Sequence, residues 1–227
     1  MRDDVKGTMT LGGFSEVMAA LALFFATHSV PAVPGVRGRL VSMLGRRFYV
    51  VLHSVVATAA LAWLIAATLR APYVELWGFH PWTRWVPLLV MPVACMLLVA
   101  GLTSPNPFSL GRGGRGYDPA RPGIVAITRH PTLWAAALWA FAHLFPNGDL
   151  RAVLLFGGMG GFSLMGMVLF DRRRAAQLGR VEWRRLLAAT ARQPSFAGLA
   201  WRAGLGLVLY AALLFAHGPL FGRYPLG

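Results

Sequence analysis

The chain has 227 residues, of which 56% are hydrophobic and only 13% are charged. Soluble domains carry roughly a quarter of charged residues, so this composition excludes a soluble enzyme, a secreted disulfide scaffold, a coiled coil and a disordered tail. The net charge of +14 would indicate nucleic acid binding in a soluble protein, but most of these arginines lie between apolar segments. We therefore expect a lipid bilayer, and no nucleic acid, as partner.

Six apolar segments approach the roughly 20 residues that a helix needs to cross the hydrocarbon core. They are Met9–His28, Phe48–Leu69, Trp85–Thr103, Thr132–Phe145, Leu150–Phe170 and Ala203–Leu220. The sequence therefore predicts an all-α fold, a polytopic membrane helix bundle of about six transmembrane helices. The length favours a single transmembrane domain over residues 1–227. The one cysteine, Cys95, permits neither an intramolecular disulfide nor a cysteine-based metal site within the chain.

The basic residues between these segments are unevenly distributed, which predicts the orientation. Two loops carry four arginines each and the loop after the fifth segment carries eight, so that 16 lie on one side and 6 on the other. The positive-inside rule places the richer side in the cytoplasm. We expect both termini outside, in a multi-pass protein of the cell inner membrane.

Two further segments have recognisable patterns. Residues 171–192 place Leu178, Trp183 and Leu187 among arginines, which is typical of an amphipathic helix on the cytoplasmic surface of the membrane. Gly157 and Gly161 form a GxxxG pair in the fifth segment, and such a pair lets two helices approach closely.

The histidines are the residues that point to chemistry. Five of the six lie in or at the ends of predicted spans, and these are His28, His53, His130, His143 and His217. Ionisable residues at membrane depth are costly and usually functional, although a single histidine can simply bridge two helices. The chain has no HExxH or similar local pair that would predict zinc. One or two axial histidines and an apolar slot between helices suffice for haem, which we therefore expect as the cofactor.

Spacing limits which histidines can share an iron. His130 and His143 are 13 residues apart, about 20 Å along a helix, so they cannot both ligate one iron. Depth in the membrane favours His28 with His130 on the cytoplasmic side, or His143 with His217 on the outer side. His53 also lies toward the cytoplasmic side and remains a candidate.

Two stretches of the chain, residues 24–64 and 121–166, resemble the NnrU family of bacterial integral membrane proteins. The resemblance rests on His-x-x-Pro from His28, Arg-Arg-x-Tyr from Arg46, Arg-His-Pro from Arg129 and His-Leu-x-x-x-Gly-Asp from His143. It implies a link to nitrite and nitric oxide metabolism in denitrification. It also implies kinship with the plant 15-cis-zeta-carotene isomerase, which binds haem b. By this resemblance His28 and His143 would be the metal ligands, in contrast to the pairs that depth favours.

A second resemblance concerns Arg129, His130 and Pro131 at the start of a membrane helix. The triplet is similar to that of the isoprenylcysteine carboxyl methyltransferase superfamily, where it helps to form an S-adenosylmethionine pocket. Three functions thus stay open: an isomerase-like or redox-linked haem enzyme acting on a lipid-soluble or gaseous molecule, a haem sensor or accessory factor, and a methyltransferase-like enzyme. No catalytic residue is assigned by the sequence.

Overall fold

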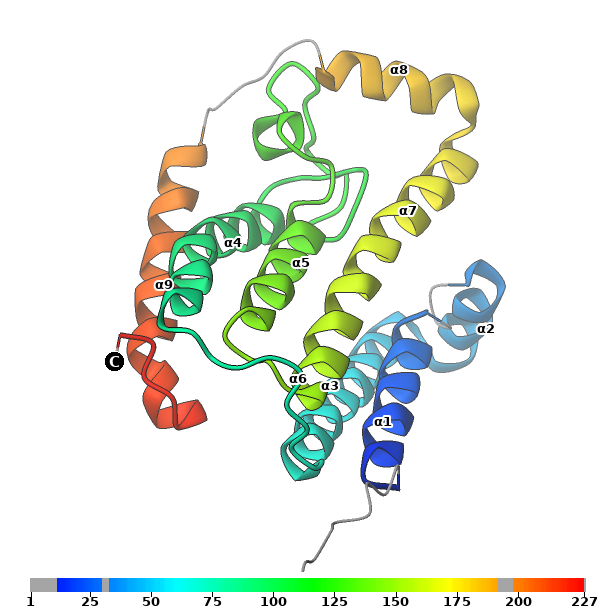
Figure 1. The fold of residues 1–227 in the computed structure, drawn as a ribbon. Helices are drawn as coiled ribbons and strands as arrows, with labels where there is room; N and C mark the ends of the chain where they lie inside the picture. Colours follow the sequence, from blue (N-terminus) through cyan, green and yellow to red (C-terminus); the bar gives the residue numbers. More distant parts are fainter. Residues whose placement is uncertain (1–11, 30–32, 192–197, 227) are drawn as a thin grey trace, which may run out of the picture. The chain divides into compact units, whose positions relative to one another are not determined.

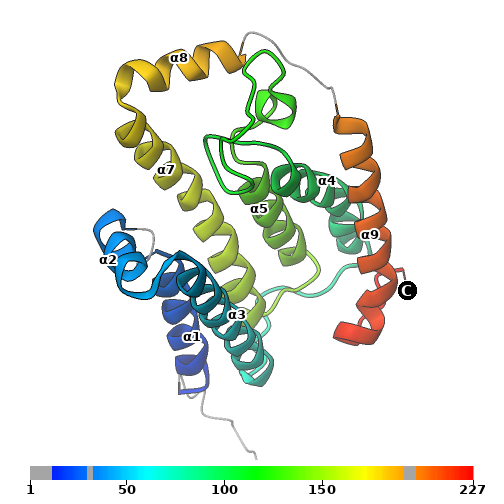
Figure 2. The same cartoon turned by 180° about the vertical axis from the view of Figure 1, so that it is seen from behind.

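The computed structural model describes residues 12–29, 33–191 and 198–226 (Figures 1 and 2). Within these ranges the chain forms helices and no strand, with an isolated antiparallel bridge between Glu75 and Asp149. The all-α prediction is therefore confirmed. The chain divides into two compact units, one within residues 1–78 and 148–158 and the other within residues 79–147 and 159–227.

The first unit is built on two antiparallel helices, α1 (Gly12–Ser29) and α3 (Arg46–Arg70). Small and aliphatic side chains are buried in this unit, among them Val17, Ala20 and Leu64. The short helix α2 (Pro34–Leu44) joins them. It begins with a proline, whose missing N–H is not needed in the first turn, and ends at Gly45, which has a φ of 76°.

The first unit also contains the short helix α6 (Leu150–Ala152) and the π-helical turn η4 (Val153–Gly157). Backbone hydrogen bonds tie this segment to the chain that follows α3. The amides of Leu76 and Trp77 donate to the carbonyl oxygen of Gly148, at 2.7 and 3.0 Å. A Cβ at Gly148 would collide with the backbone of Trp77, so this close approach requires glycine.

The second unit is centred on α4 (Trp85–Thr103), which follows the 3₁₀ turn η2 (Pro81–Arg84) and lies between α5 (Pro131–Leu144) and α9 (Leu199–Phe221) in both views (Figures 1 and 2). Glycines allow both contacts. A Cβ on Gly101 would collide with Oγ1 of Thr132 in α5, and a Cβ on Gly206 of α9 would lie 2.5 Å from Cα of Met96. Close backbone approach at small residues is the usual basis of helix packing in membranes.

The loop after α4 folds into a small core of its own. Phe108 is completely buried, and Ile124 and Val125 of the 3₁₀ turn η3 (Gly123–Ala126) pack with it. Helix α8 (Arg180–Ala191) covers this core with Trp183, whose ring centroid lies 5.5 Å from that of Phe108. The hydroxyls of Tyr117 and Thr190 are 2.7 Å apart and add a polar tie between loop and helix.

The segment predicted as one amphipathic helix over residues 171–192 is divided in the structure. Helix α7 (Gly158–Leu178) continues beyond the apolar run, the chain turns at Gly179 with a φ of 79°, and α8 follows. The apolar side of α8 packs on protein, against Phe108 and its neighbours. Its location on a membrane surface stays a prediction, and Arg192 lies outside the described residues.

Four helical stretches of the described chain are long and apolar enough to cross a membrane. They are Arg46–Arg70, Pro81–Thr103, Leu150–Leu178 and Leu199–Phe221. Helix α5 has 14 residues and is about 21 Å long, less than the thickness of the hydrocarbon core. The count of six spans and the outward termini remain predictions, and the expected start of the first span, Met9, lies outside the described residues.

The close approaches in the fifth segment involve other glycines than the predicted pair. A Cβ at Gly161 would meet nothing within 4 Å, and one at Gly157 would only touch its own helix. Gly160 lies instead against the ring of Phe141 in α5, within the second unit, and Gly158 lies against Leu21 of α1, within the first. The GxxxG spacing is present, but it does not mark the contact.

Candidate functional site

The Arg-His-Pro triplet lies where the loop after α4 enters α5. Asn106, which is completely buried, holds this junction. Its Nδ2 donates to the carbonyl oxygen of Arg129 at 2.9 Å, and its Oδ1 accepts from the amide of Phe108 at 2.9 Å. Pro131 then begins the helix without needing an N–H partner. The position of Arg129 and His130 is therefore fixed by the loop core described above.

Asp171 of α7 accepts hydrogen bonds from both members of the pair. Nε2 of His130 lies 3.0 Å from Oδ1 of Asp171, and Nη2 of Arg129 lies 2.8 Å from Oδ2. Nε of Arg129 lies 3.4 Å from Oδ1, so the guanidinium faces both carboxylate oxygens. The carboxylate of Asp171 thus joins α7 to the start of α5 through the side chains of Arg129 and His130. We call these three residues the Arg–His–Asp cluster.

The cluster holds His130 in one tautomer. The side chain is only 6% exposed, and because an ionised carboxylate can only accept, Nε2 carries the proton that is shared with Asp171. The lone pair then lies on Nδ1, which is buried and has no hydrogen-bond partner within the described part of the chain. Burial lowers the pKa of His130 below its usual 6.5, and the opposing effect of Asp171 does not offset it. At neutral pH this imidazole is a neutral acceptor of a proton or hydrogen bond.

His143 lies in the last turn of α5, at the end opposite to His130. Its Nδ1 is 2.7 Å from the carbonyl oxygen of Trp139, so Nδ1 donates and the lone pair lies on Nε2. The same unit contains His217 of α9, which interacts electrostatically with His143 and whose Nδ1 is 2.9 Å from the carbonyl oxygen of Arg223. The two histidines that depth pairs on the outer side therefore lie in the same unit.

The first unit contains a second histidine pair. His28 at the end of α1 and His53 of α3 have ring centroids 6.2 Å apart. Nδ1 of His28 lies 2.8 Å from the carbonyl oxygen of Phe24, which again fixes the proton on Nδ1. The ring of Tyr49 stacks on His53 with a centroid distance of 5.9 Å.

The structure brings together some of the predicted residues. His28 lies beside His53 in one unit, and His143 and His217 both lie in the other. The pairing of His28 with His143, which the family resemblance implies, and that of His28 with His130 join residues of different units and stay predictions. His130 is held by a carboxylate that the sequence interpretation had not assigned to it.

Sequence reasoning missed Asp171 and Asn106. Both carried a signal. Asp171 is an acid at the end of an apolar run and directly before Arg172, where a cation would be expected. Asn106 stands between two prolines, Pro105 and Pro107, which is typical of a rigid turn.

The family model described as NnrU protein matches residues 16–225, nearly the whole chain. No curated protein and no solved structure matches the chain. The match covers both units, including the histidines and the Arg–His–Asp cluster.

Proposed function

The chain belongs to the NnrU family, and on this basis we propose that it is a membrane protein that binds haem b. We infer an isomerase-like or redox-linked activity on a lipid-soluble molecule or a small nitrogen oxide. The observation that supports the proposal is the hydrogen bond that fixes the ring of His143 and the ring of His28. Each has its Nδ1 bound to the carbonyl oxygen of the residue four positions earlier, at 2.7 and 2.8 Å.

This arrangement suits an iron ligand. Metal-binding histidines almost always donate their second ring nitrogen to a carbonyl or carboxylate, which fixes the tautomer and the ring orientation. Within the described residues no three His, Cys, Asp or Glu side chains are grouped to hold a bare metal ion. Haem supplies four nitrogens itself and requires only one or two from the protein. The donor set therefore fits haem better than it fits a mononuclear zinc or iron site.

When bound, haem would supply an iron that can coordinate a small molecule or change oxidation state. The residues of this chain have simpler tasks. His143 and His28 would each present Nε2 in a direction that is fixed by the bond from Nδ1 to the helix backbone. The surrounding apolar helices would exclude water and admit a lipid-soluble substrate from the bilayer.

The ligand assignment can be tested by removing one histidine at a time. Protein purified in mild detergent from haem-replete cells should show a Soret band. His143→Ala should lose haem or convert it to a high-spin form, and added imidazole should restore the spectrum if only the ligand was lost. His80→Ala is the matched control, because His80 is exposed in a loop. A wild-type low-spin spectrum of His143→Ala at normal abundance would rule out this ligand.

The same test applied to His28→Ala, His53→Ala, His130→Ala and His217→Ala identifies the second ligand. A haem sensor or accessory factor for nitrite and nitric oxide metabolism would give the same spectra as an enzyme. Only the enzyme would convert a carotenoid or a nitrogen oxide in multiple turnovers, so turnover separates the two.

The Arg–His–Asp cluster favours a second candidate, a methyltransferase-like site for S-adenosylmethionine. Its supporting observation is the buried, unpartnered Nδ1 of His130, which can accept a hydrogen bond from a bound ligand. Equilibrium dialysis with S-adenosylmethionine should then show saturable binding that His130→Asn weakens. A featureless visible spectrum after haem supplementation, together with such binding, would replace the haem proposal by this one.

A further inference from the structure

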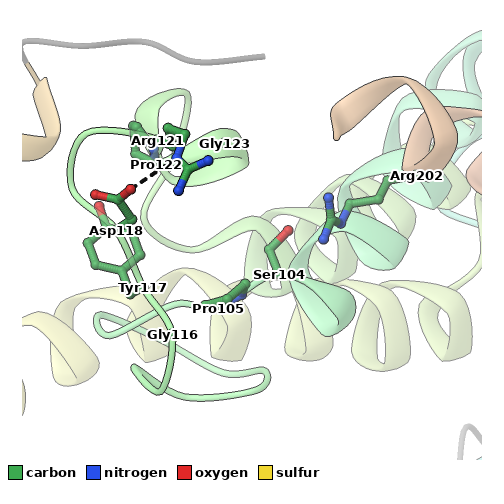
Figure 3. A pocket seen from close by; sticks show the side chains of 9 residues that line it. All are labelled: Ser104, Pro105, Gly116, Tyr117, Asp118, Arg121, Pro122, Gly123 and Arg202. Carbon is green, nitrogen blue, oxygen red and sulfur yellow. Dashed lines mark hydrogen bonds and ion pairs between the residues drawn. The ribbon is translucent and has the colours of Figure 1, made fainter. Parts of the chain in front are cut away.

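A polar pocket lies at the end of α4, between the loop that follows this helix and the beginning of α9. It has a volume of about 250 Å³. Figure 3 shows Arg121 and Arg202 approaching it from different elements, with Ser104 between them and Tyr117 on the far side. Asp118 also lines the pocket, but its carboxylate is already bound to Nε of Arg121 at 3.0 Å and to the amide of Ala120 at 2.9 Å.

Two guanidinium groups meet beside this pocket without a counter-charge. Arg112 of the loop and Arg202 of α9 both donate to the carbonyl oxygen of Thr103, each at 3.4 Å. Their positive charges repel one another. Neither has an ion-pair partner among the described residues, so the site carries an excess of positive charge that a bound anion would relieve.

Arg202 is held in a defined geometry. Its Nε donates to Oγ1 of Thr103 at 3.0 Å and its Nη1 donates to the carbonyl oxygen of Gly198 at 2.7 Å. The guanidinium also lies over the ring of Trp201, 4.4 Å from the centroid. A guanidinium has five N–H donors, and the protein uses three of them here. The remaining two are already oriented, which lowers the entropy cost of binding an oxyanion.

The pocket lies at the level where two membrane helices end. The candidate span Pro81–Thr103 finishes at Thr103, and the candidate span Leu199–Phe221 begins at Leu199. Because Arg202 contacts Thr103, these two ends are side by side. Residues at such a boundary face lipid headgroups, whose phosphates are the most abundant anions there.

We propose that this pocket binds a phosphate-bearing anion, with Arg202 as its principal ligand and Arg121 at its rim. Arg112, which shares the carbonyl oxygen of Thr103 with Arg202, adds positive charge beside the pocket. The anion has two possible sources with the same chemistry, the headgroup phosphate of an anionic lipid or a soluble phosphate. The site is separate from the histidines to which haem is assigned, so it can be tested without any cofactor.

The decisive comparison is between two double substitutions that remove the same charge. Arg112→Gln with Arg202→Gln removes the pocket arginine Arg202 and its neighbour Arg112, whereas Arg180→Gln with Arg184→Gln removes two exposed arginines of α8. Native mass spectrometry counts the lipids retained, and detergent solutions with phosphatidylglycerol or phosphatidylcholine give affinities. A basic residue near a membrane surface contributes roughly fivefold in affinity for anionic lipid, so the pocket double variant should bind phosphatidylglycerol about 25-fold more weakly. The control pair should change this affinity clearly less, because exposed arginines that line no pocket are screened by solvent in detergent solution.

Inorganic phosphate distinguishes the two sources. If it raises the melting temperature of the wild type and displaces phosphatidylglycerol, the pocket recognises the phosphate itself and takes it from solution as well. If phosphatidylglycerol is retained in excess phosphate, the ligand is the lipid headgroup. Arg112→Gln alone guards against misfolding, because this exposed residue makes one long hydrogen bond. Equal loss of binding in the pocket and control variants, or no anion binding by the wild type, would overturn the proposal.

Discussion

The Arg–His–Asp cluster predicts a large effect for the small substitution Asp171→Asn. The carboxylate accepts from His130 at 3.0 Å and from Arg129 at 2.8 Å. The bond from the buried imidazole is worth about 1.5–3 kcal/mol, because the acceptor is charged. The ion pair adds at most about 1 kcal/mol, since the Arg129 and Asp171 side chains are 41% and 28% exposed and solvent screens them. Asparagine keeps one acceptor oxygen, so the expected loss of stability is about 2 kcal/mol, a fall in Tm of roughly 4–8 °C for a chain of this size.

The pH dependence gives the same substitution a second signature. The pKa of His130 lies below the usual 6.5 in the folded protein, mainly because of burial. As the pH falls below 6.5, the unfolded chain takes up this proton and the folded chain does not, so stability falls. Asp171 is the group that raises the pKa. Its removal lowers the pKa further, and the difference in Tm between wild type and Asp171→Asn should therefore widen as the pH is lowered from 8 through the folded-state pKa of His130.

Thermal unfolding in detergent at several pH values measures both effects. Glu182→Gln is the matched control, because its exposed partner Arg185 lies 3.6 Å away and such a surface pair is worth about 0.5 kcal/mol or less. A Tm of Asp171→Asn within about 1 °C of the wild type at pH 8 would refute the cluster. A difference that narrows toward acid pH would show that His130 is not the buried neutral imidazole that the hydrogen bonds indicate.

Three further predictions concern packing and orientation. Gly206→Ala should lower the free energy of unfolding by about 2 kcal/mol by thermal unfolding, because its Cβ would collide with the backbone of α4; Gly204→Ala, with nothing within 4 Å, should not. Phe108→Ala should cost about 3–5 kcal/mol and make α8 accessible to protease, because this ring is completely buried beneath the helix. Reporter fusions should give a cytoplasmic signal at Arg180 and an external signal after Arg223; the reverse pattern would invert the predicted orientation.

Hydropathy predicted those features of the fold that depend on local sequence. The third apolar segment, Trp85–Thr103, coincides with α4, and the fourth, Thr132–Phe145, differs from α5 by one residue at each end. These helix ends can be predicted from the sequence because a proline, an arginine or a polar loop residue interrupts each apolar run. The helix α2 was not predicted, since its 11 residues are neither apolar nor regularly amphipathic.

The other missed features depend on backbone conformation or on contacts between distant residues. The amphipathic pattern over residues 171–192 continues across Gly179, and only the positive φ of this glycine ends α7 there. The apolar residues of α8 could pack on a membrane surface as well as on Phe108. The sequence alone therefore predicted a membrane surface as the partner of this helix. The bond between His130 and Asp171 joins residues 41 positions apart, and no periodicity reports such a pair.

Because the chain has few carboxylates, the placement of Asp171 in the Arg–His–Asp cluster is informative. With 22 basic residues against 8 acidic ones, most arginines cannot find an acid within the chain and must face water, carbonyl oxygens or lipid phosphates. An exposed acidic residue in such a chain readily finds a neighbouring arginine, so most of its ion pairs need no special arrangement of the fold. The pairs of Glu182 and Asp118 are of this kind, because they join exposed neighbours three residues apart. Asp171 instead joins α7 to the start of α5 and holds a buried imidazole. The position of Asp171 is therefore explained by the two side chains that it binds. Arg112 and Arg202 are the opposite case, because two cations share one carbonyl oxygen and the anion that we propose to balance them comes from outside the chain.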